Sequence, residues 1–160
     1  MVLSRAVSGI APLLLGVLGG CTHHLEASDL AAAPVWYRAD TTSILRNFGQ
    51  PIRRIREDHG SLGSLTMWYY PHLALAFQGG AWCDQIRLLD STLSTPRGIR
   101  VGDVVGAVLK AYGRPAARTR NGDSLWVSYD GPRTWQALSF LAVHDTVRAI
   151  TMGQRAFLFL

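Results

Sequence analysis

Residues 44–51 read ILRNFGQP, and residues 108–115 read VLKAYGRP. Both octapeptides hold an apolar pair, an aromatic residue, a glycine and a proline in the same order. Apolar residues at helical spacing, followed by glycine and then proline, are typical of the last turns of a helix, because glycine accepts a positive φ angle and proline prevents continuation. The phrase therefore predicts two helices that end in the same way.

Similar residues recur in the same order beyond the two octapeptides. The offset between the copies changes slightly along the chain, as loops of different length would cause. This order predicts an internal repeat, with copy one at about residues 40–92 and copy two at about residues 96–153. The further matches are Leu65 and Tyr69 with Leu125 and Tyr129, Leu75 and Phe77 with Leu138 and Phe140, and residues 84–87 with residues 145–148.

Each copy is predicted to be a helix followed by an antiparallel meander of three strands. Thr42 and Asp103 are the expected helix N-caps, and Gly113 is the expected end of the second helix. The residues between each helix and its first strand read as turn-rich spacers. The fold class is therefore α+β: two tandem helix-plus-antiparallel-meander repeats, side by side or joined in one curved sheet with the helices on one face. The expected strands cover residues 64–70, 73–77, 84–89, 124–129, 135–141 and 146–152.

The N-terminal region ends an apolar run with Leu18-Gly19-Gly20-Cys21. A branched apolar residue, two small residues and a cysteine resemble the lipobox of bacterial lipoproteins, which implies that Cys21 is acylated, with palmitate among the expected chains. The apolar run is too short to span a membrane, and an ordinary secretory signal is the alternative. We predict a signal peptide over residues 1–20, a tether over residues 21–35 and the repeat domain over residues 36–160.

These assignments predict a cell-envelope location, with attachment to the membrane through the lipid. If enterobacterial sorting rules apply, Thr22 permits transfer to the periplasmic face of the outer membrane. If Cys21 is acylated, Cys83 has no partner and is expected to be a buried small hydrophobic residue; otherwise a Cys21–Cys83 disulfide is the alternative.

The charge balance adds a weak preference for anionic partners. The whole chain carries a formal net charge of +5, and Lys110 is its one lysine among 16 basic residues. A moderately basic envelope protein favours lipid head groups or acidic protein surfaces. Export argues against a nucleic-acid partner.

The recurring helix end, followed by strands, resembles the SmpA/OmlA and β-lactamase-inhibitor-like (BLIP-like) group, and residues 98–103 resemble the way that group enters its helix. The resemblance implies a small envelope lipoprotein or a secreted inhibitor that binds protein through a sheet. Neither copy contains the cysteine pair of the inhibitors, so inhibition of a β-lactamase is not implied.

Catalytic chemistry finds little support in the sequence. Residues 60–64 read GSLGS, whereas the nucleophile elbow of hydrolases is G-x-S-x-G. The alternative function is a hydrolase-like lipoprotein enzyme with an unrecognised site, whose base would come from His59, His72 or His144 beside Asp84 or Asp145. Adjacent His23 and His24 lack a third ligand nearby, so we predict neither a metal nor a cofactor.

Aromatic residues and arginines on the predicted strands say more about function than the candidate catalytic residues do. Alternate strand positions point inward, so about half of these aromatic residues belong to the core. The remainder, mixed with arginine, has the composition of a protein-binding surface. We therefore predict a protein-binding or assembly module for an envelope protein, with the binding residues Trp68, Tyr70, Trp82, Trp126, Trp135, Arg87, Arg133 and Arg148.

The last residues of the chain, 155–160, read RAFLFL. They are predicted either to form a strand that covers an open sheet edge or to be an exposed apolar tail with a partner.

Overall fold

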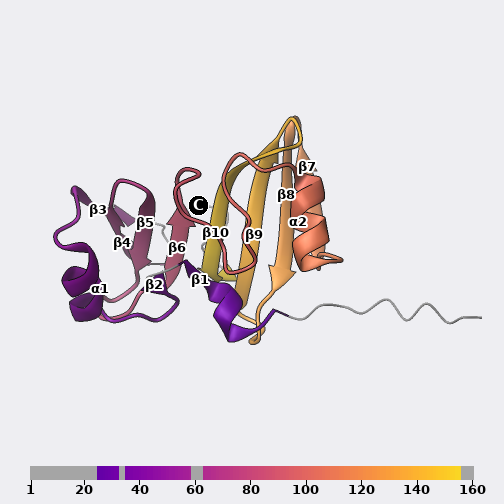
Figure 1. The fold of residues 1–160 in the computed structure, drawn as a ribbon. Coiled ribbons are helices and arrows are strands. Elements are labelled where there is room, and N and C mark those ends of the chain that lie inside the picture. The colour runs from indigo at the N-terminus through magenta and orange to yellow at the C-terminus, as the bar shows by residue number, and fades with distance from the viewer. Residues whose placement is uncertain (1–24, 33–34, 59–62, 156–160) are drawn as a thin grey trace, which may run out of the picture.

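The computed structural model of the protein describes residues 25–32, 35–58 and 63–155 (Figure 1). Strands dominate these ranges, and the helices are short. In chain order the elements are η1 Ala27–Leu30 (a 3-10 helix), β1 Ala31–Ala32, β2 Val35–Trp36, α1 Thr41–Phe48, β3 Arg53–Asp58, β4 Ser64–Tyr69, β5 Leu73–Phe77, β6 Gln85–Leu88, α2 Val105–Tyr112, β7 Ala117–Asn121, β8 Ser124–Asp130, β9 Gln136–Val143 and β10 Thr146–Gln154.

Eight of the strands form one antiparallel sheet in the order β3-β4-β5-β6-β10-β9-β8-β7. Its centre is the pairing of β6 with β10, in which Leu88 lies opposite Ile150 and Gln85 opposite Gly153. We call β3–β6 with α1 the first half and β7–β10 with α2 the second half. Figure 1 shows α1 near the β3 end of the sheet and α2 near the β7 end.

The seam between the two halves requires glycine at one position. A Cβ on Gly153 would lie 2.2 Å from the carbonyl oxygen of Asp84, and Gly153 has a φ of 137°. Gln154 then donates its backbone N–H to the same carbonyl at 3.0 Å. The close approach of β10 to the residue before β6 therefore excludes any side chain at position 153.

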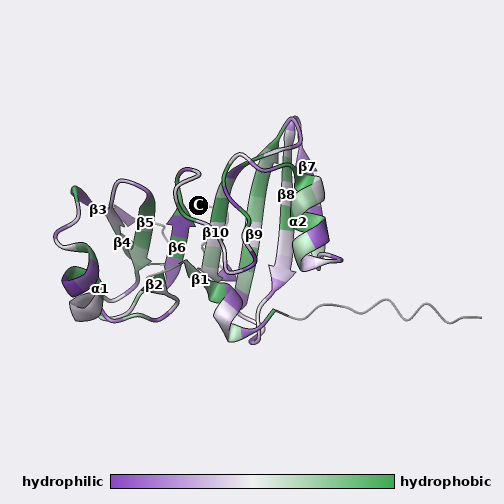
Figure 2. Cartoon of the chain, viewed as in Figure 1, coloured by the Kyte–Doolittle hydropathy of each residue, from purple (hydrophilic) through white to green (hydrophobic). Residues whose placement is uncertain are grey.

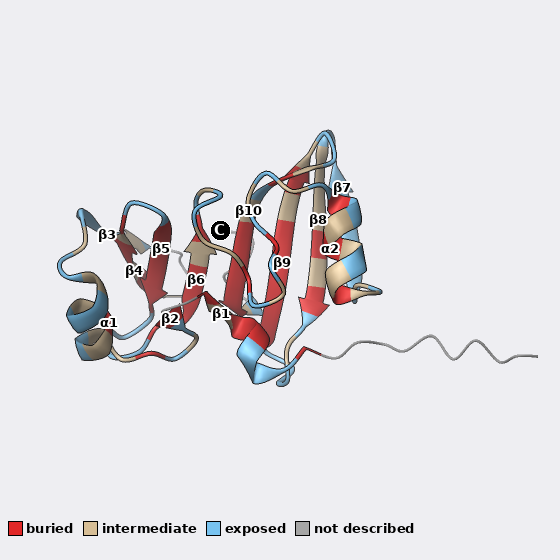
Figure 3. Ribbon diagram, in the orientation of Figure 1, coloured by how far each residue is buried: buried red, intermediate tan, exposed pale blue. Residues whose placement is uncertain are grey.

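The main apolar core covers one face of this sheet, and a second, small cluster of Met67, Ala74 and Ala76 lies apart from it. Both helices and the connection between β6 and α2 contribute to the main core, and its strand residues include Leu75, Phe140 and Ile150. Figures 2 and 3 show that apolar, buried residues concentrate on the middle strands, while the outer strands are more polar and exposed. Burial of these side chains is the main stabilising contribution to the fold.

The predicted fold class, α+β with two tandem helix-plus-meander repeats, is wrong. The fold is largely β, because eight strands make up one antiparallel sheet while helices account for few residues; the single sheet itself was one of the two expected arrangements. Each helix has only eight residues. The six predicted strands do exist, as β4, β5, β6, β8, β9 and β10, with ends within two residues of those expected.

Besides the short pair β1 and β2, sequence reasoning missed β3 and β7, which are the two edges of the eight-stranded sheet. β3 reads RRIRED and β7 reads ARTRN, and neither sequence has the apolar pattern that predicts a strand. Edge strands commonly carry charged side chains, which discourage pairing with another chain. The same charge that protects these edges therefore concealed them in the sequence.

Both expected helix N-caps are also wrong. Asp40 caps α1, and its carboxylate accepts the backbone N–H of Ser43 at 2.8 Å. Val104 occupies the corresponding position of α2, while the Asp103 carboxylate accepts the backbone N–H of Arg100 at 2.8 Å.

Most of the predicted tether belongs to the folded domain. Within the predicted range of residues 21–35, Leu25, Leu30 and Ala32 are buried in the core. Apolar side chains in this short, alanine-rich stretch fill space above the sheet, which periodicity cannot reveal in so few residues. If the chain is attached at Cys21, the part of the link that precedes the domain is residues 22–24.

Candidate functional site: a tryptophan and arginine patch

Exposed aromatic residues gather at one end of the middle strands. The start of β6, the start of β9 and the end of β10 meet there, since Gly153 pairs with Gln85 and Gln154 with Gln136. The loops that enter β6 and β9 carry Trp82 and Trp135, and the segment around β2 carries Trp36. We call Trp36, Trp82, Trp135, Arg38 and Arg133 the tryptophan–arginine patch.

The exposure of the three tryptophans is unusual for so large a side chain. Trp36 is 51% exposed, Trp82 48% and Trp135 43%. Isolated exposed apolar residues need no explanation, but a group of them at one place indicates a contact surface.

Arg38 joins the β2 segment to the loop before β6. Its backbone N–H donates to the carbonyl of Cys83 at 2.8 Å. Its guanidinium forms an ion pair with the buried Asp84 carboxylate at 2.7 Å and lies 5.8 Å from the Trp82 ring centroid. Asp84 also accepts the backbone N–H of Gln78 at 2.7 Å. The base of the patch is therefore held by a satisfied buried charge.

Trp135 is supported on two sides. Its ring centroid lies 6.0 Å from that of Tyr37, and the Arg133 guanidinium lies 5.9 Å from it. The Trp135 carbonyl accepts the backbone N–H of Arg155 at 2.8 Å. Burial raises the pKa of Tyr37, so its hydroxyl stays protonated at neutral pH. These contacts restrain the exposed indole, which reduces the conformational entropy that it would lose on binding.

The charges around the patch are largely paired within the protein. Arg38 pairs with Asp84, and Arg155 pairs with Asp130. Arg133 differs, because no carboxylate among the described residues pairs with its guanidinium. The patch is thus mainly aromatic, with one cation available to a partner.

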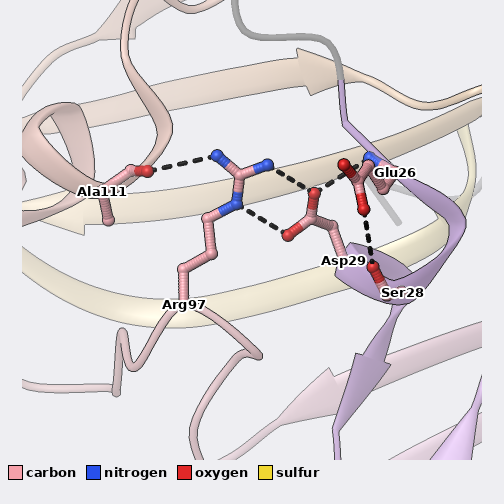
Figure 4. A network of polar contacts seen from close by, with 5 residues as sticks. All are labelled: Glu26, Ser28, Asp29, Arg97 and Ala111. Carbon is pink, nitrogen blue, oxygen red and sulfur yellow. Dashed lines mark hydrogen bonds and ion pairs between the residues drawn. The ribbon is translucent and has the colours of Figure 1, made fainter.

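Figure 4 shows how the segment before the patch is attached to the domain. Arg97 donates from Nε and Nη2 to the two carboxylate oxygens of Asp29, at 2.8 Å and 2.7 Å. Its Nη1 donates to the Ala111 carbonyl at 3.3 Å, and the guanidinium lies 4.8 Å from the Tyr112 ring centroid. Because Asp29 is buried and its partner is bidentate, this ion pair fixes η1 onto the second half.

Of the predicted binding residues, Trp82, Trp135 and Arg133 lie in the patch. Trp68 and Tyr70 do not, because both are buried in the core under α1, where the Tyr70 hydroxyl donates to the Gly49 carbonyl at 3.2 Å. They are therefore core residues, and the prediction that they belong to an exposed binding surface is wrong.

The remaining predicted binding residues lie on strands, away from the patch. Trp126 pairs with Leu141, and Arg87 with Thr151, both on the sheet face opposite the helices. Arg148 is exposed at the irregularity in β10 between Val147 and Ala149. The structure does not join these three to the patch in one surface.

Sequence reasoning missed Trp36 and Arg38. Trp36 follows the predicted tether directly, and no periodic pattern surrounds it. The triplet Trp36-Tyr37-Arg38 itself was the available signal, since two aromatic residues beside an arginine are uncommon in a solvated linker.

The described histidines do not form an enclosed catalytic site. His72 Nδ1 lies 2.7 Å from the Asp90 carboxylate, and His144 Nε2 lies 3.8 Å from that of Asp123. The side chains of the first pair are 46% and 42% exposed, and those of the second 75% and 79%. Both pairs are therefore in contact with solvent, and they lack the buried, low-dielectric surroundings that shift the pKa of a general base.

The buried thiol is also unsuited to catalysis. Burial raises the pKa of Cys83 to about 12, and its Sγ donates to the Gln85 carbonyl at 3.2 Å. A protonated, inaccessible thiol is a poor nucleophile, which agrees with its predicted role as a small core residue. In the described ranges no three His, Cys, Asp or Glu side chains are grouped to hold a metal ion.

Three sequence features lie partly or wholly outside the described residues. They are Cys21 with His23 and His24, the stretch from His59 to Leu62, and the C-terminal residues 156–160. Within the described part, no helix is both long and apolar enough to cross a membrane.

Comparison with protein-family models gave no match, and neither did comparison with curated proteins. Solved structures with a similar fold do exist. A DUF4309 family protein, YjgB from Bacillus subtilis subsp. subtilis str. 168, is 15% identical with a TM-score of 0.50, over 73% of this chain and 79% of that one.

Two further structures are similar at a TM-score of 0.55 each. An extracellular protein containing a SCP domain from Bacillus anthracis str. Ames is 10% identical over 77% of this chain and 45% of that one. A cysteine-rich secretory protein (SAV1118) from Staphylococcus aureus subsp. aureus Mu50 is 8% identical over 84% and 51%. The chain thus spans about half the length of these two proteins, and at such low identity the likeness shows the fold alone. The resemblance to the SmpA/OmlA and BLIP-like group stays a prediction.

Proposed function

We propose that this chain is a lipid-anchored, non-enzymatic binding module of the cell envelope. Acylation of Cys21 holds it on a membrane, and the tryptophan–arginine patch contacts a second envelope component. The observation that carries the proposal is that Trp82 and Trp135, both exposed, lie beside Arg38 and Arg133 at one end of the sheet. The exposed Trp36 is next in the chain to Tyr37, which contacts Trp135.

The location part of the proposal has separate support. Two of the similar structures come from proteins described as extracellular or secretory, which agrees with an exported location. The lipobox-like residues 18–21 add the finer assignment of a lipid anchor. The periplasmic face of the outer membrane is the expected site in a Gram-negative cell.

The binding part rests on the composition and rigidity of the patch. Tryptophan and arginine supply much of the binding energy at interfaces, especially where they are held in place before binding. In the patch, an ion pair, main-chain hydrogen bonds and the Tyr37 ring provide that support.

The anchor is tested with the two cysteines of the chain. We expect the wild type and Cys83→Ala to incorporate labelled palmitate and to fractionate with membranes, and Cys21→Ser to do neither. Mass spectrometry of the N-terminal peptide identifies the modified residue. An unmodified Cys21 in the wild type would refute the anchor.

The contact surface is tested by placing a photo-crosslinking amino acid at Trp135 or Trp82 in intact cells. Ile52 is a matched control position, because it is 73% exposed and apolar but lies outside the patch. We expect adducts, to protein or to lipid, from the two patch positions and not from Ile52. Equal adduct yields at all three positions would exclude the patch as the contact surface.

A further inference from the structure

We infer that the tryptophan–arginine patch faces the membrane and that its partner is the head-group layer of the bilayer itself. The inference rests on the proposed acylation of Cys21. It goes beyond that proposal by assigning both the orientation of the domain and the chemical nature of the second component.

The link between the proposed anchor and the domain is short. Leu25 is 4% exposed and belongs to the core, so the domain begins four residues after Cys21. Four fully extended residues span about 14 Å. The radius of gyration of a domain of this size is itself about 14 Å. The link is therefore too short for the domain to turn an arbitrary side toward the bilayer.

The patch and the segment that follows the proposed anchor form one continuous structure. Asp29 is clamped by Arg97, and the next residue, Leu30, accepts the backbone N–H of Tyr37 at 2.9 Å. Ala31 pairs directly with Trp36 in the two-stranded ladder of β1 and β2. The ring of Tyr37 in turn lies against Trp135. The surface brought closest to the membrane by the link is thus the surface that carries the patch.

The side chains of the patch suit a membrane–water interface. Tryptophan is enriched at membrane–water interfaces, where the ring meets the acyl boundary while the indole N–H stays among polar groups. Arg133 has its charge available to anionic head groups, and the flexible arginine stem lets the guanidinium reach them. Because Arg38 and Arg155 are paired with Asp84 and Asp130, aromatic burial rather than net charge dominates the expected contact.

The inference is tested by tryptophan fluorescence of the acylated full chain in vesicles of phosphatidylethanolamine and phosphatidylglycerol with brominated acyl chains. Bromine quenches only indoles that reach the bilayer. We expect marked quenching in the wild type and loss of most of it when Trp36, Trp82 and Trp135 are all replaced by phenylalanine. Circular dichroism confirms that the triple variant is folded.

Trp126→Phe is the matched control, because Trp126 lies on the sheet face opposite the core and outside the patch. This variant should keep the wild-type quenching. An acylated, vesicle-bound wild type that shows no quenching would overturn the inference while leaving the anchor intact. Absence of acylation would instead refute the proposed function. Protein adducts at Trp135 without bromine quenching would assign the patch to a protein partner.

A second experiment alters the link and leaves the patch unchanged. A flexible glycine–serine insertion after Thr22 lengthens the link outside the described residues. We expect acylation and vesicle binding to persist while quenching of the patch tryptophans falls, because the domain can then rotate away. Unchanged quenching would contradict a role for the short link in setting the orientation.

Discussion

In both halves of the molecule the helix ends at a glycine whose carbonyl accepts a tyrosine hydroxyl, but the two helix ends are buried to different depths. In the first half the Tyr70 hydroxyl donates to the Gly49 carbonyl at 3.2 Å, and in the second the Tyr129 hydroxyl donates to that of Gly113 at 3.0 Å. The ring centroids of Phe48 and Tyr70 lie 5.4 Å apart, as do those of Tyr112 and Tyr129.

The surroundings of these two arrangements differ. Tyr112 is fully buried, covered by the Arg97 guanidinium and packed against Phe140, whereas Phe48 is only half-buried. α2 buries three side chains and α1 buries one. The N-terminal segment contributes to this cover, since Asp29 holds Arg97 over the second half. A shared local pattern thus fixes the shape of both helix ends, while tertiary cover decides how much each contributes to stability.

The largest expected effect comes from removing the two helix-end aromatic residues separately. We expect Tyr112→Ala to lower the free energy of unfolding by about 3–5 kcal/mol, because it leaves a cavity in a fully covered core. Phe48→Ala should cost about 1–2 kcal/mol, because that side chain is only partly buried. Chemical denaturation of both variants measures the difference. Equal losses would mean that the two halves are equally covered.

A smaller effect is expected from the two glycines that end the helices. Gly49 has φ and ψ of 71° and −158°, and Gly113 has 73° and −146°. Both glycines have the predicted positive φ. Their ψ angles place them outside the left-handed helical region, in a region that essentially only glycine adopts. Gly49→Val and Gly113→Val should each cost about 1–3 kcal/mol, with similar values.

Thermal and chemical denaturation of both valine variants check this expectation, with Gly106→Ala as a control inside α2. Gly106 has no positive φ, and nothing lies within 4 Å of an added Cβ. The control should therefore be neutral or slightly stabilising. An unchanged melting temperature in Gly113→Val would refute the backbone argument.

The smallest expected effect on stability comes from the ion pair between Asp29 and Arg97. Among the described residues, only the second half has such an ion pair beside its helix. Burial opposes ionisation of Asp29. The hydrogen bonds that Asp29 accepts from Arg97 and from the Glu26 backbone N–H, together with the positive charge of Arg97, outweigh this effect, so the pKa of Asp29 is lowered from its ordinary value. Asp29→Asn keeps one acceptor and should cost about 1 kcal/mol at neutral pH.

The pH dependence sharpens this prediction. Because the pKa of Asp29 is lower in the folded than in the unfolded protein, its contribution is complete above 3.8 and is lost as pH falls through the folded value. Denaturation at neutral and acidic pH should therefore show the gap between wild type and Asp29→Asn closing in acid. Asp123→Asn, at a side chain 79% exposed, should show no such change. A constant gap would contradict an ionised Asp29.

Local sequence determined the helix ends and six of the strands. The octapeptides at residues 44–51 and 108–115 predict where each helix stops, since the glycine and proline act through the backbone of their own neighbours. Strands with an apolar pattern were likewise found close to their true ends. The buried state of Cys83 and the exposure of Trp82, Trp135 and Arg133 agree with the sequence interpretation.

Tertiary structure alone decided the rest. Pairing of β6 with β10 selects one continuous sheet over two units side by side, and it depends on a close backbone approach at Gly153 that no neighbouring residue signals. Packing in the main core places Leu25, Leu30 and Ala32, from the predicted tether, inside the domain, and it buries Trp68 and Tyr70, which were expected on the surface. The patch joins residues from segments about 100 positions apart, from Trp36 to Trp135. Such long-range contacts depend on which surfaces meet in the folded chain, and the local pattern of apolar residues does not predict which surfaces meet.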